Sequence, residues 1–137
     1  MRVAMYFLLF LIILAVAGMT WFRLAPNDEQ RWHVLIADTE NADHIFGVTR
    51  VMDGSPATLD AFNTSFLSEP RTKILAGTVQ DGHITYVTRS KFWGFPDYTT
   101  VQLVDDQLRI FARLRFGRSD LGVNRARIDR VLAALKG

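Results

Sequence analysis

The stretch Tyr98–Phe116, YTTVQLVDDQLRIFARLRF, decides the fold because it predicts two antiparallel strands joined at Asp105–Asp106. If those two residues form the turn, Val101 faces Ile110 and the other residues pair in the same register. This register collects the apolar side chains of both strands on one face and the polar and charged ones on the other. The sequence therefore predicts an antiparallel sheet with one face turned toward an apolar core.

A second hairpin precedes the first one. Residues Arg71–Gln80 and His83–Lys91 have the composition of strands and flank Asp81–Gly82, a dipeptide that favours a two-residue type I′ turn. Two further strands are indicated by the β-branched and aromatic residues of Trp32–Ile36 and Ile45–Met52. We therefore expect an antiparallel sheet of four or more strands.

Two amphipathic helices are expected to cover the apolar face of this sheet. The first has Ser55 as its N-cap and Pro56 in the first helical position, and it ends before Pro70. The second begins at Asn124, a suitable N-cap, and runs toward the C-terminus. Apolar residues recur at helical spacing in both segments: Leu59, Phe62, Phe66 and Leu67, and then Ile128, Val131, Leu132 and Leu135. The expected fold class is α+β.

The N-terminal segment Met5–Phe22 contains no charged residue. As a helix it would span about 27 Å, close to the hydrocarbon thickness of a bilayer, and Trp21 lies where an interfacial aromatic residue is expected. A cleaved signal peptide is the alternative, because Ala15–Ala17 fits the small-x-small pattern of a cleavage site. We divide the chain into a transmembrane anchor or signal peptide (1–23), a linker (24–31) and a single soluble α+β domain (32–137).

The predicted topology follows from the N-terminal tail. A short tail before a first transmembrane helix usually stays in the cytoplasm, which leaves the domain on the opposite side of the membrane. The polar linker reaches at most about 25 Å, so it keeps the domain close to the bilayer. We therefore expect a single-pass protein that contacts lipid through residues 5–22.

Charged residues are distributed unevenly, although the formal net charge is only +2. From Gln107 onward basic residues outnumber acidic ones, whereas the segment between Leu24 and Asp106 is acidic. Such opposed halves either pair within the fold or leave a basic surface for an anion. Because the soluble domain as a whole is nearly neutral, nucleic acid is not an expected partner.

No motif in the sequence indicates catalysis or a cofactor. The chain has no cysteine, and the spacing of its three histidines, His33, His44 and His83, matches no metal site. A solvated polar loop explains the carboxylates near His44 better than a metal cluster does. Glycine-rich phosphate loops and nucleophile motifs are also absent. We therefore expect no enzymatic activity, no cofactor and no metal.

Two stretches combine charged and aromatic residues at unusual density. The first, Arg89–Tyr98, is a loop between strands with aromatic residues around a glycine and a proline. It is interpreted either as a packed Ω-like turn, with a cis bond between Phe95 and Pro96, or as a loop that recognises a partner or the membrane surface. Its candidate residues are Arg89, Trp93, Phe95, Pro96, Asp97 and Tyr98.

The second stretch, Arg113–Arg125, follows the last predicted strand and leads into the C-terminal helix. Strand alternation puts Arg109, Arg113 and Arg115 on one face near Tyr98, an arrangement that suits an anion pocket. In the alternative interpretation, Asp97 and Asp120 hold these arginines in a structural network. The candidate residues of this stretch are Arg113, Arg115, Arg118, Ser119, Asp120, Asn124 and Arg125.

These same two stretches resemble the signature of domain-of-unknown-function family 1499, a family of small bacterial and plastid proteins. The similarity rests on Gly94–Asp97 and on Gly117–Arg127, GRSDLGVNRAR, and covers roughly Asp53–Leu135. The resemblance implies a domain to which no activity is assigned. Together with the apolar N-terminal segment, it implies a single-pass protein of a bacterial inner membrane with its soluble domain on the periplasmic side.

Two functional hypotheses follow. The first is a non-enzymatic accessory or interaction protein that works as a subunit or assembly partner of a membrane complex, with another membrane protein as its partner. The second is a binder of an anionic ligand or lipid headgroup through the arginine-rich and aromatic surface. An enzyme of a new type is a third reading, which a pocket with a shifted carboxylate pKa would favour.

Overall fold

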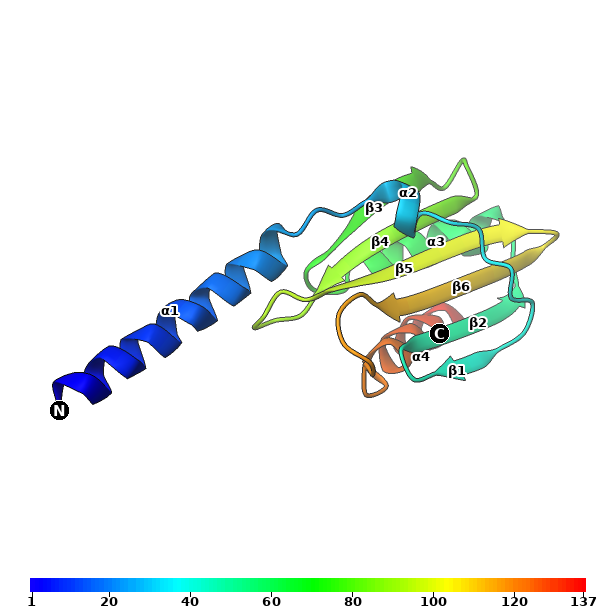
Figure 1. The fold of residues 1–137 in the computed structure, drawn as a ribbon. Coiled ribbons are helices and arrows are strands. Elements are labelled where there is room, and N and C mark those ends of the chain that lie inside the picture. Colours follow the sequence, from blue (N-terminus) through cyan, green and yellow to red (C-terminus); the bar gives the residue numbers. More distant parts are fainter.

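The structure, a computed structural model, describes residues 1–137 and consists of a long N-terminal helix and an α+β body (Figure 1). The chain forms α1 (Arg2–Leu24), α2 (Glu29–Trp32), β1 (Ala42–His44), β2 (Gly47–Asp53), α3 (Pro56–Leu67), β3 (Thr72–Thr78), β4 (His83–Arg89), β5 (Pro96–Val104), β6 (Gln107–Leu114) and α4 (Val123–Lys136). The strands form one sheet in the order β1-β2-β6-β5-β4-β3, and all neighbours are antiparallel. The predicted fold class is confirmed.

The hairpin of β5 and β6 has the predicted register. Val101 faces Ile110 and Tyr98 faces Arg113 across the two strands. Asp105 has a φ of 50° and Asp106 a φ of 58°, as both central residues of a type I′ turn require. The two-residue turn therefore fixes which side chains of this hairpin enter the core.

The predicted two-residue turn of the preceding hairpin is wrong. Thr78 pairs with His83, so four residues connect β3 and β4. Gly82 alone of the expected pair has a positive φ, of 68°, and its N–H donates to the carbonyl of Val79 over 3.0 Å. The single left-handed residue closes a longer loop, and a β-bulge between Ile74 and Ala76 shifts the register of β3 again.

The start of α3 is as predicted, whereas that of α4 is not. The Ser55 hydroxyl accepts a hydrogen bond from the Thr58 N–H, and Pro56 is the first helical residue. In α4 the predicted N-cap Asn124 already lies inside the first turn and is fully buried. The carboxylate of Asp120 caps this helix instead, because Gly122 is left-handed and turns the chain so that two backbone N–H groups reach that carboxylate.

The main core lies between one face of the sheet and the helices α3 and α4 (Figure 1). Its largest members include Phe62 and Phe66 of α3, Ile128 of α4 and Tyr86 of the sheet. Both helices contribute their predicted apolar stripe except for Leu67, which is exposed at the end of α3. Burial of these side chains is the dominant force that holds the helices on the sheet.

The opposite face of the sheet is covered by the chain between α1 and β1. The strand predicted over Trp32–Ile36 is wrong: Trp32 ends the short helix α2, and irregular chain follows. Trp32 and Ile36 are buried, and the Ile36 N–H donates to the side chain of Gln102 rather than to a neighbouring strand. The β-branched and aromatic residues therefore indicate burial here and no strand.

The N-terminal helix α1 leaves the body at one end of the sheet (Figure 1). It is long and apolar enough to cross a membrane, with a mean hydropathy of 2.5 over its most apolar window, and none of that window is buried. A signal sequence has the same length and composition. The residues that follow α1 pack on the body, since Asn27 accepts a hydrogen bond from the Tyr98 hydroxyl.

Candidate functional site

The last turn of α1 packs against the body through aromatic side chains. The ring of Phe22 meets Phe95 edge to face, with a centroid distance of 4.5 Å, and Phe116 at 5.0 Å. Phe95 belongs to the loop between β4 and β5, and Phe116 follows β6. Edge-to-face pairs of this kind stabilise beyond the apolar area that they bury. The end of α1 is thus packed against the body, and no flexible linker separates the two.

Arginines add polar contacts to this junction. The Nη1 atom of Arg89 donates to two carbonyl oxygens, that of Phe22 at 3.0 Å and that of Gly94 at 2.9 Å. Arg115 donates to the carbonyl of Pro26 over 2.7 Å and lies over the ring of Phe116. The predicted candidates Arg89 and Arg115 therefore fix the chain at the point where α1 ends.

The loop Ser90–Phe95 combines features of both interpretations. Phe95 packs against the body, as the packed-turn interpretation expects. The backbone N–H of Phe95 donates a hydrogen bond to the Ser90 hydroxyl over 2.9 Å. The expected cis bond before Pro96 is wrong, because every peptide bond is trans and Gly94, with a φ of 73°, provides the reversal of the chain. Phe92 and Trp93 remain 67% and 40% exposed, so the tip of this loop is an apolar surface.

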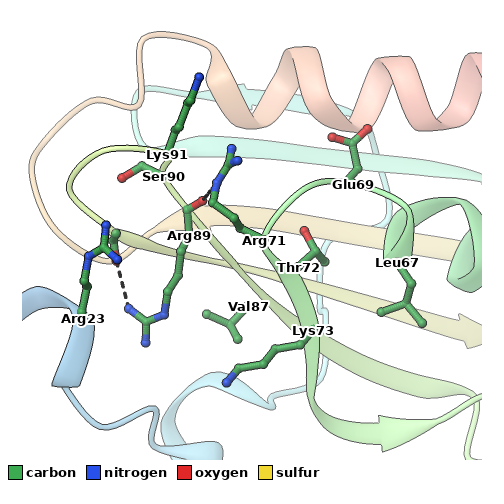
Figure 2. A pocket seen from close by; sticks show the side chains of 11 residues that line it. Arg23, Leu67, Glu69, Arg71, Thr72, Lys73, Val87, Arg89, Ser90 and Lys91 are labelled. Atoms are coloured by element: carbon green, nitrogen blue, oxygen red, sulfur yellow. Dashed lines mark hydrogen bonds between the residues drawn. The ribbon is translucent and has the colours of Figure 1, made fainter.

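A basic cavity of about 520 Å³ lies between the end of α1, the start of β3 and the end of β4 (Figure 2). Its cationic lining residues are Arg23, Arg71, Lys73, Arg89 and Lys91. Glu69 is the single acidic lining residue, and its carboxylate pairs with Arg130 of α4 over 2.7 Å. The cavity therefore carries a strong positive charge that no carboxylate within it balances.

Sequence analysis identified only Arg89 of this basic cavity. In the true register of the β3–β4 hairpin the Arg89 N–H donates to the Arg71 carbonyl, so these two arginines lie side by side. The expected two-residue turn would have displaced one strand along the other and separated them. The four-residue loop and the β-bulge of β3, neither of which was predicted, set the register that brings the two residues together.

Arg113 is not part of an anion pocket, contrary to the expectation. Its side chain is buried between the rings of Trp32 and Phe111 under the covering chain. The guanidinium donates to the Thr100 hydroxyl over 2.8 Å and to the carbonyl of Trp32. Burial lowers the pKa of Arg113 to about 10. The physical reason is that the polar face of the hairpin is covered by the chain and closed to ligands.

Tyr98 belongs to the same closed face. Its ring is fully buried and stacks on Trp32 with a centroid distance of 4.1 Å. Its hydroxyl donates to the side chain of Asn27 over 2.6 Å and accepts from Arg115 over 3.1 Å. The sequence correctly put Arg113 and Arg115 near Tyr98, but the three side chains hold the covering chain and form no open pocket.

Asp97 and Asp120 meet near the start of α4, but they do not hold the expected arginines. The arginine that pairs with Asp97 is Arg127, at 3.6 Å, and Asp120 is the cap of α4. Asn124 is buried beside them, and its side-chain oxygen accepts from Arg127 over 2.9 Å. The alternative network is therefore corrected: these signature residues join β5 to α4 and leave Arg109, Arg113 and Arg115 to other partners.

Burial raises the pKa of Asp97 to about 6, and Arg127 opposes this shift only in part. The folded state therefore binds a proton more readily than the unfolded chain. This contribution to stability is fully present below about pH 4 and is lost as the pH rises through 6. The difference between a pKa of about 6 and the ordinary pKa of an aspartate corresponds to about 3 kcal/mol.

Asp97→Asn is expected to remove this pH dependence. Between pH 4 and pH 6 the free energy of unfolding of the wild type should fall relative to that of the variant, by up to about 3 kcal/mol. Urea unfolding of the full-length protein in a neutral detergent, at pH 4, 5, 6 and 7, measures the difference. Parallel pH profiles would contradict the assignment.

The remaining candidates lie on the surface, with the exception of Pro96. Arg118 and Ser119 are exposed in the loop after β6, and Pro96 is buried at the start of β5. Arg125 is exposed and forms an ion pair with Asp43 of β1 at 3.3 Å. Exposed pairs of this kind contribute little to stability. The structure thus divides the candidates among the α1 junction, the covered face, the start of α4 and open surface.

Comparison with protein families gives a match over most of the chain. The family model described as "Protein of unknown function (DUF1499)" matches residues 25–135. The matched part begins directly after α1 and extends into the last turn of α4. No curated protein matches the chain.

Proposed function

Because this chain belongs to the DUF1499 family, whose description assigns no function, we propose a role from its own geometry: a non-enzymatic, membrane-anchored interaction protein that assembles with another membrane protein. The docking of α1 on the body carries this proposal. Phe22 is locked between Phe95 and Phe116, so the domain follows α1 as one unit. With α1 in a bilayer, the body is held at the membrane surface, on the periplasmic side of a bacterial inner membrane.

An exposed apolar residue at this end of the body supports a protein partner. Leu121 is 91% exposed and has a φ of 53°, a conformation that costs free energy for a residue with a side chain. The carbonyl of Ile45, another exposed apolar residue, accepts a hydrogen bond from Asp120 beside it. The fold buries little of either side chain. An apolar surface next to a membrane helix suits a contact with a neighbouring membrane protein.

Affinity purification in a mild detergent tests this function. The full-length tagged protein, cross-linked in membranes before extraction, is expected to recover a second membrane protein in reproducible amount. Leu121→Asn should reduce that recovery at least five-fold without loss of stability, because asparagine tolerates the left-handed conformation. Leu35→Asn, at another exposed leucine on the covering chain, is the matched control and should leave recovery unchanged.

Recovery of the monomer alone from cross-linked membranes would overturn the proposal. Equal recovery by wild type and Leu121→Asn would keep an assembly role but remove this surface from it.

A further inference from the structure

We propose that the basic cavity beside α1 binds the phosphate group of an anionic lipid headgroup. The cavity opens between residues of three elements: Arg23 of α1, Arg71 and Lys73 at the start of β3, and Arg89 at the end of β4 (Figure 2). The inference shares one premise with the proposed function, the insertion of α1 in a bilayer. It is otherwise independent of any protein partner.

The charge of the cavity favours an anion. None of its five cationic side chains takes part in an ion pair, because every ion pair of the structure involves Arg50, Arg125, Arg127 or Arg130. Glu69, the one carboxylate of the lining, is already held by Arg130. Cations gathered without counter-charges repel one another, and a bound phosphate would relieve that repulsion.

Hydrogen bonds hold the arginines in place and leave donors free. The Nη1 atom of Arg89 donates hydrogen bonds to the carbonyls of Phe22 and Gly94. The Nη2 atom of Arg23 donates to the carbonyl of Phe92 over 3.0 Å. Arg71 donates from Nε to the carbonyl of Arg89 over 2.9 Å. Each guanidinium has five donors, so several remain for phosphate oxygens. In Figure 2 the side chains of Lys73 and Arg89 extend on the side where α1 ends.

Arg71 carries backbone strain at the rim of this cavity. Its φ is 56°, a left-handed conformation in which glycine or asparagine would cost less. Strain of this kind at a surface residue points to a use of the side chain other than folding. In this conformation the Arg71 guanidinium reaches the backbone carbonyl of Arg89, and both residues line the cavity.

The level of the cavity along α1 selects a lipid as the source of the phosphate. Arg23 lies in the last turn of α1, and the carbonyl of Phe92 that it bonds belongs to the exposed aromatic tip. Trp21, Phe92 and Trp93 are exposed at this level, as expected of side chains at a membrane–water interface. Lipid phosphates lie in the same layer, so the cavity faces headgroups whenever α1 spans the bilayer.

Lipid binding by the full-length protein in a neutral detergent tests this assignment. Native mass spectrometry with micelles that contain phosphatidylglycerol or phosphatidylcholine should give at least ten-fold tighter binding of the anionic lipid. Lys73→Gln should weaken phosphatidylglycerol binding about five-fold, and Arg71→Gly combined with Lys73→Gln about 25-fold. Arg71→Gly removes the strained conformation, so the loss cannot be attributed to unfolding.

A charge-matched control distinguishes binding at the cavity from general electrostatic attraction of the protein to an anionic lipid. Arg118→Gln combined with Lys136→Gln removes the same charge from exposed positions outside the cavity and should change binding less than two-fold. Equal losses in the two double variants, or equal binding of both lipids, would overturn the inference. Competition by inorganic phosphate at the concentration that phosphatidylglycerol requires would overturn the lipid as the source. Release of the protein from membranes by alkaline carbonate would remove the shared premise, and with it the proposed function.

Discussion

Replacing Arg113 with alanine is expected to lower the free energy of unfolding by about 3 kcal/mol. Arg113 is only 5% exposed, and its guanidinium donates to the carbonyls of Trp32 and Phe111 and to the Thr100 hydroxyl. Alanine removes one donor from each of these buried acceptors and opens a cavity between two aromatic rings. Urea unfolding of the full-length protein in a neutral detergent, followed by near-ultraviolet circular dichroism, measures the loss.

Arg113→Met separates the charge from the packing. Burial lowers the pKa of Arg113 to about 10, so the charged form is costly to bury, and methionine keeps much of the volume without that cost. The methionine variant should therefore lose less stability than the alanine variant. Arg118→Ala, at an exposed arginine without hydrogen bonds, is the control and should stay within about 0.5 kcal/mol of wild type. A loss in Arg113→Ala no larger than in this control would refute the structural role.

Gly77→Ala is expected to cost about 3–4 kcal/mol, for two separate reasons. Gly77 has a φ of 87°, which disfavours any side chain. A Cβ atom there would also overlap the carbonyl oxygen of His83 and lie 2.9 Å from Cε1 of His33. The new methyl group would push β3 away from β4 and lift the covering chain.

Gly117→Ala isolates the first of these reasons. Gly117 has a φ of 98°, but nothing lies within 4 Å of the position that its Cβ would take. This variant should lose only about 1–2 kcal/mol, the cost of the left-handed conformation. The same urea unfolding assay compares the two variants. If both lost the same amount, the crowding at Gly77 would be refuted.

The parts of the fold that sequence predicted are those in which one short pattern determines the outcome. The hairpin at Asp105–Asp106 is correct because turn type and side-chain alternation require the same register. The start of α3 is correct because Ser55 and Pro56 act within a few residues of each other. Local chemistry was sufficient in both places.

The errors arise where distant contacts override the local pattern. Trp32 and Ile36 resemble strand residues because they are buried, yet they cover a sheet whose hydrogen bonds other strands already fill. Asn124 is a good N-cap by residue type, but Asp120 reaches the free N–H groups first. Propensity describes a residue's preference and does not include such competition.

The candidate residues were located more successfully than they were interpreted. The alternation of β6 correctly put Arg113 and Arg115 near Tyr98. It could not reveal that Trp32, far away in the sequence, closes that face. The basic cavity is lined by Arg23, Arg71 and Arg89 from separate parts of the chain, and no local motif predicts that they come together.

The order of the strands places one group of carboxylates at the end of the sheet far from α1. Asp53 pairs with Gln107 at the end of the sheet opposite to α1, and the β3–β4 and β5–β6 turns lie at that end. The acidic residues of this remote end are Asp53, Asp81, Asp105 and Asp106, and the cations gather at the other. An anionic membrane surface would therefore attract the cationic end of the body and repel the acidic end. This orients the body with its α1 end toward the membrane before any specific contact forms.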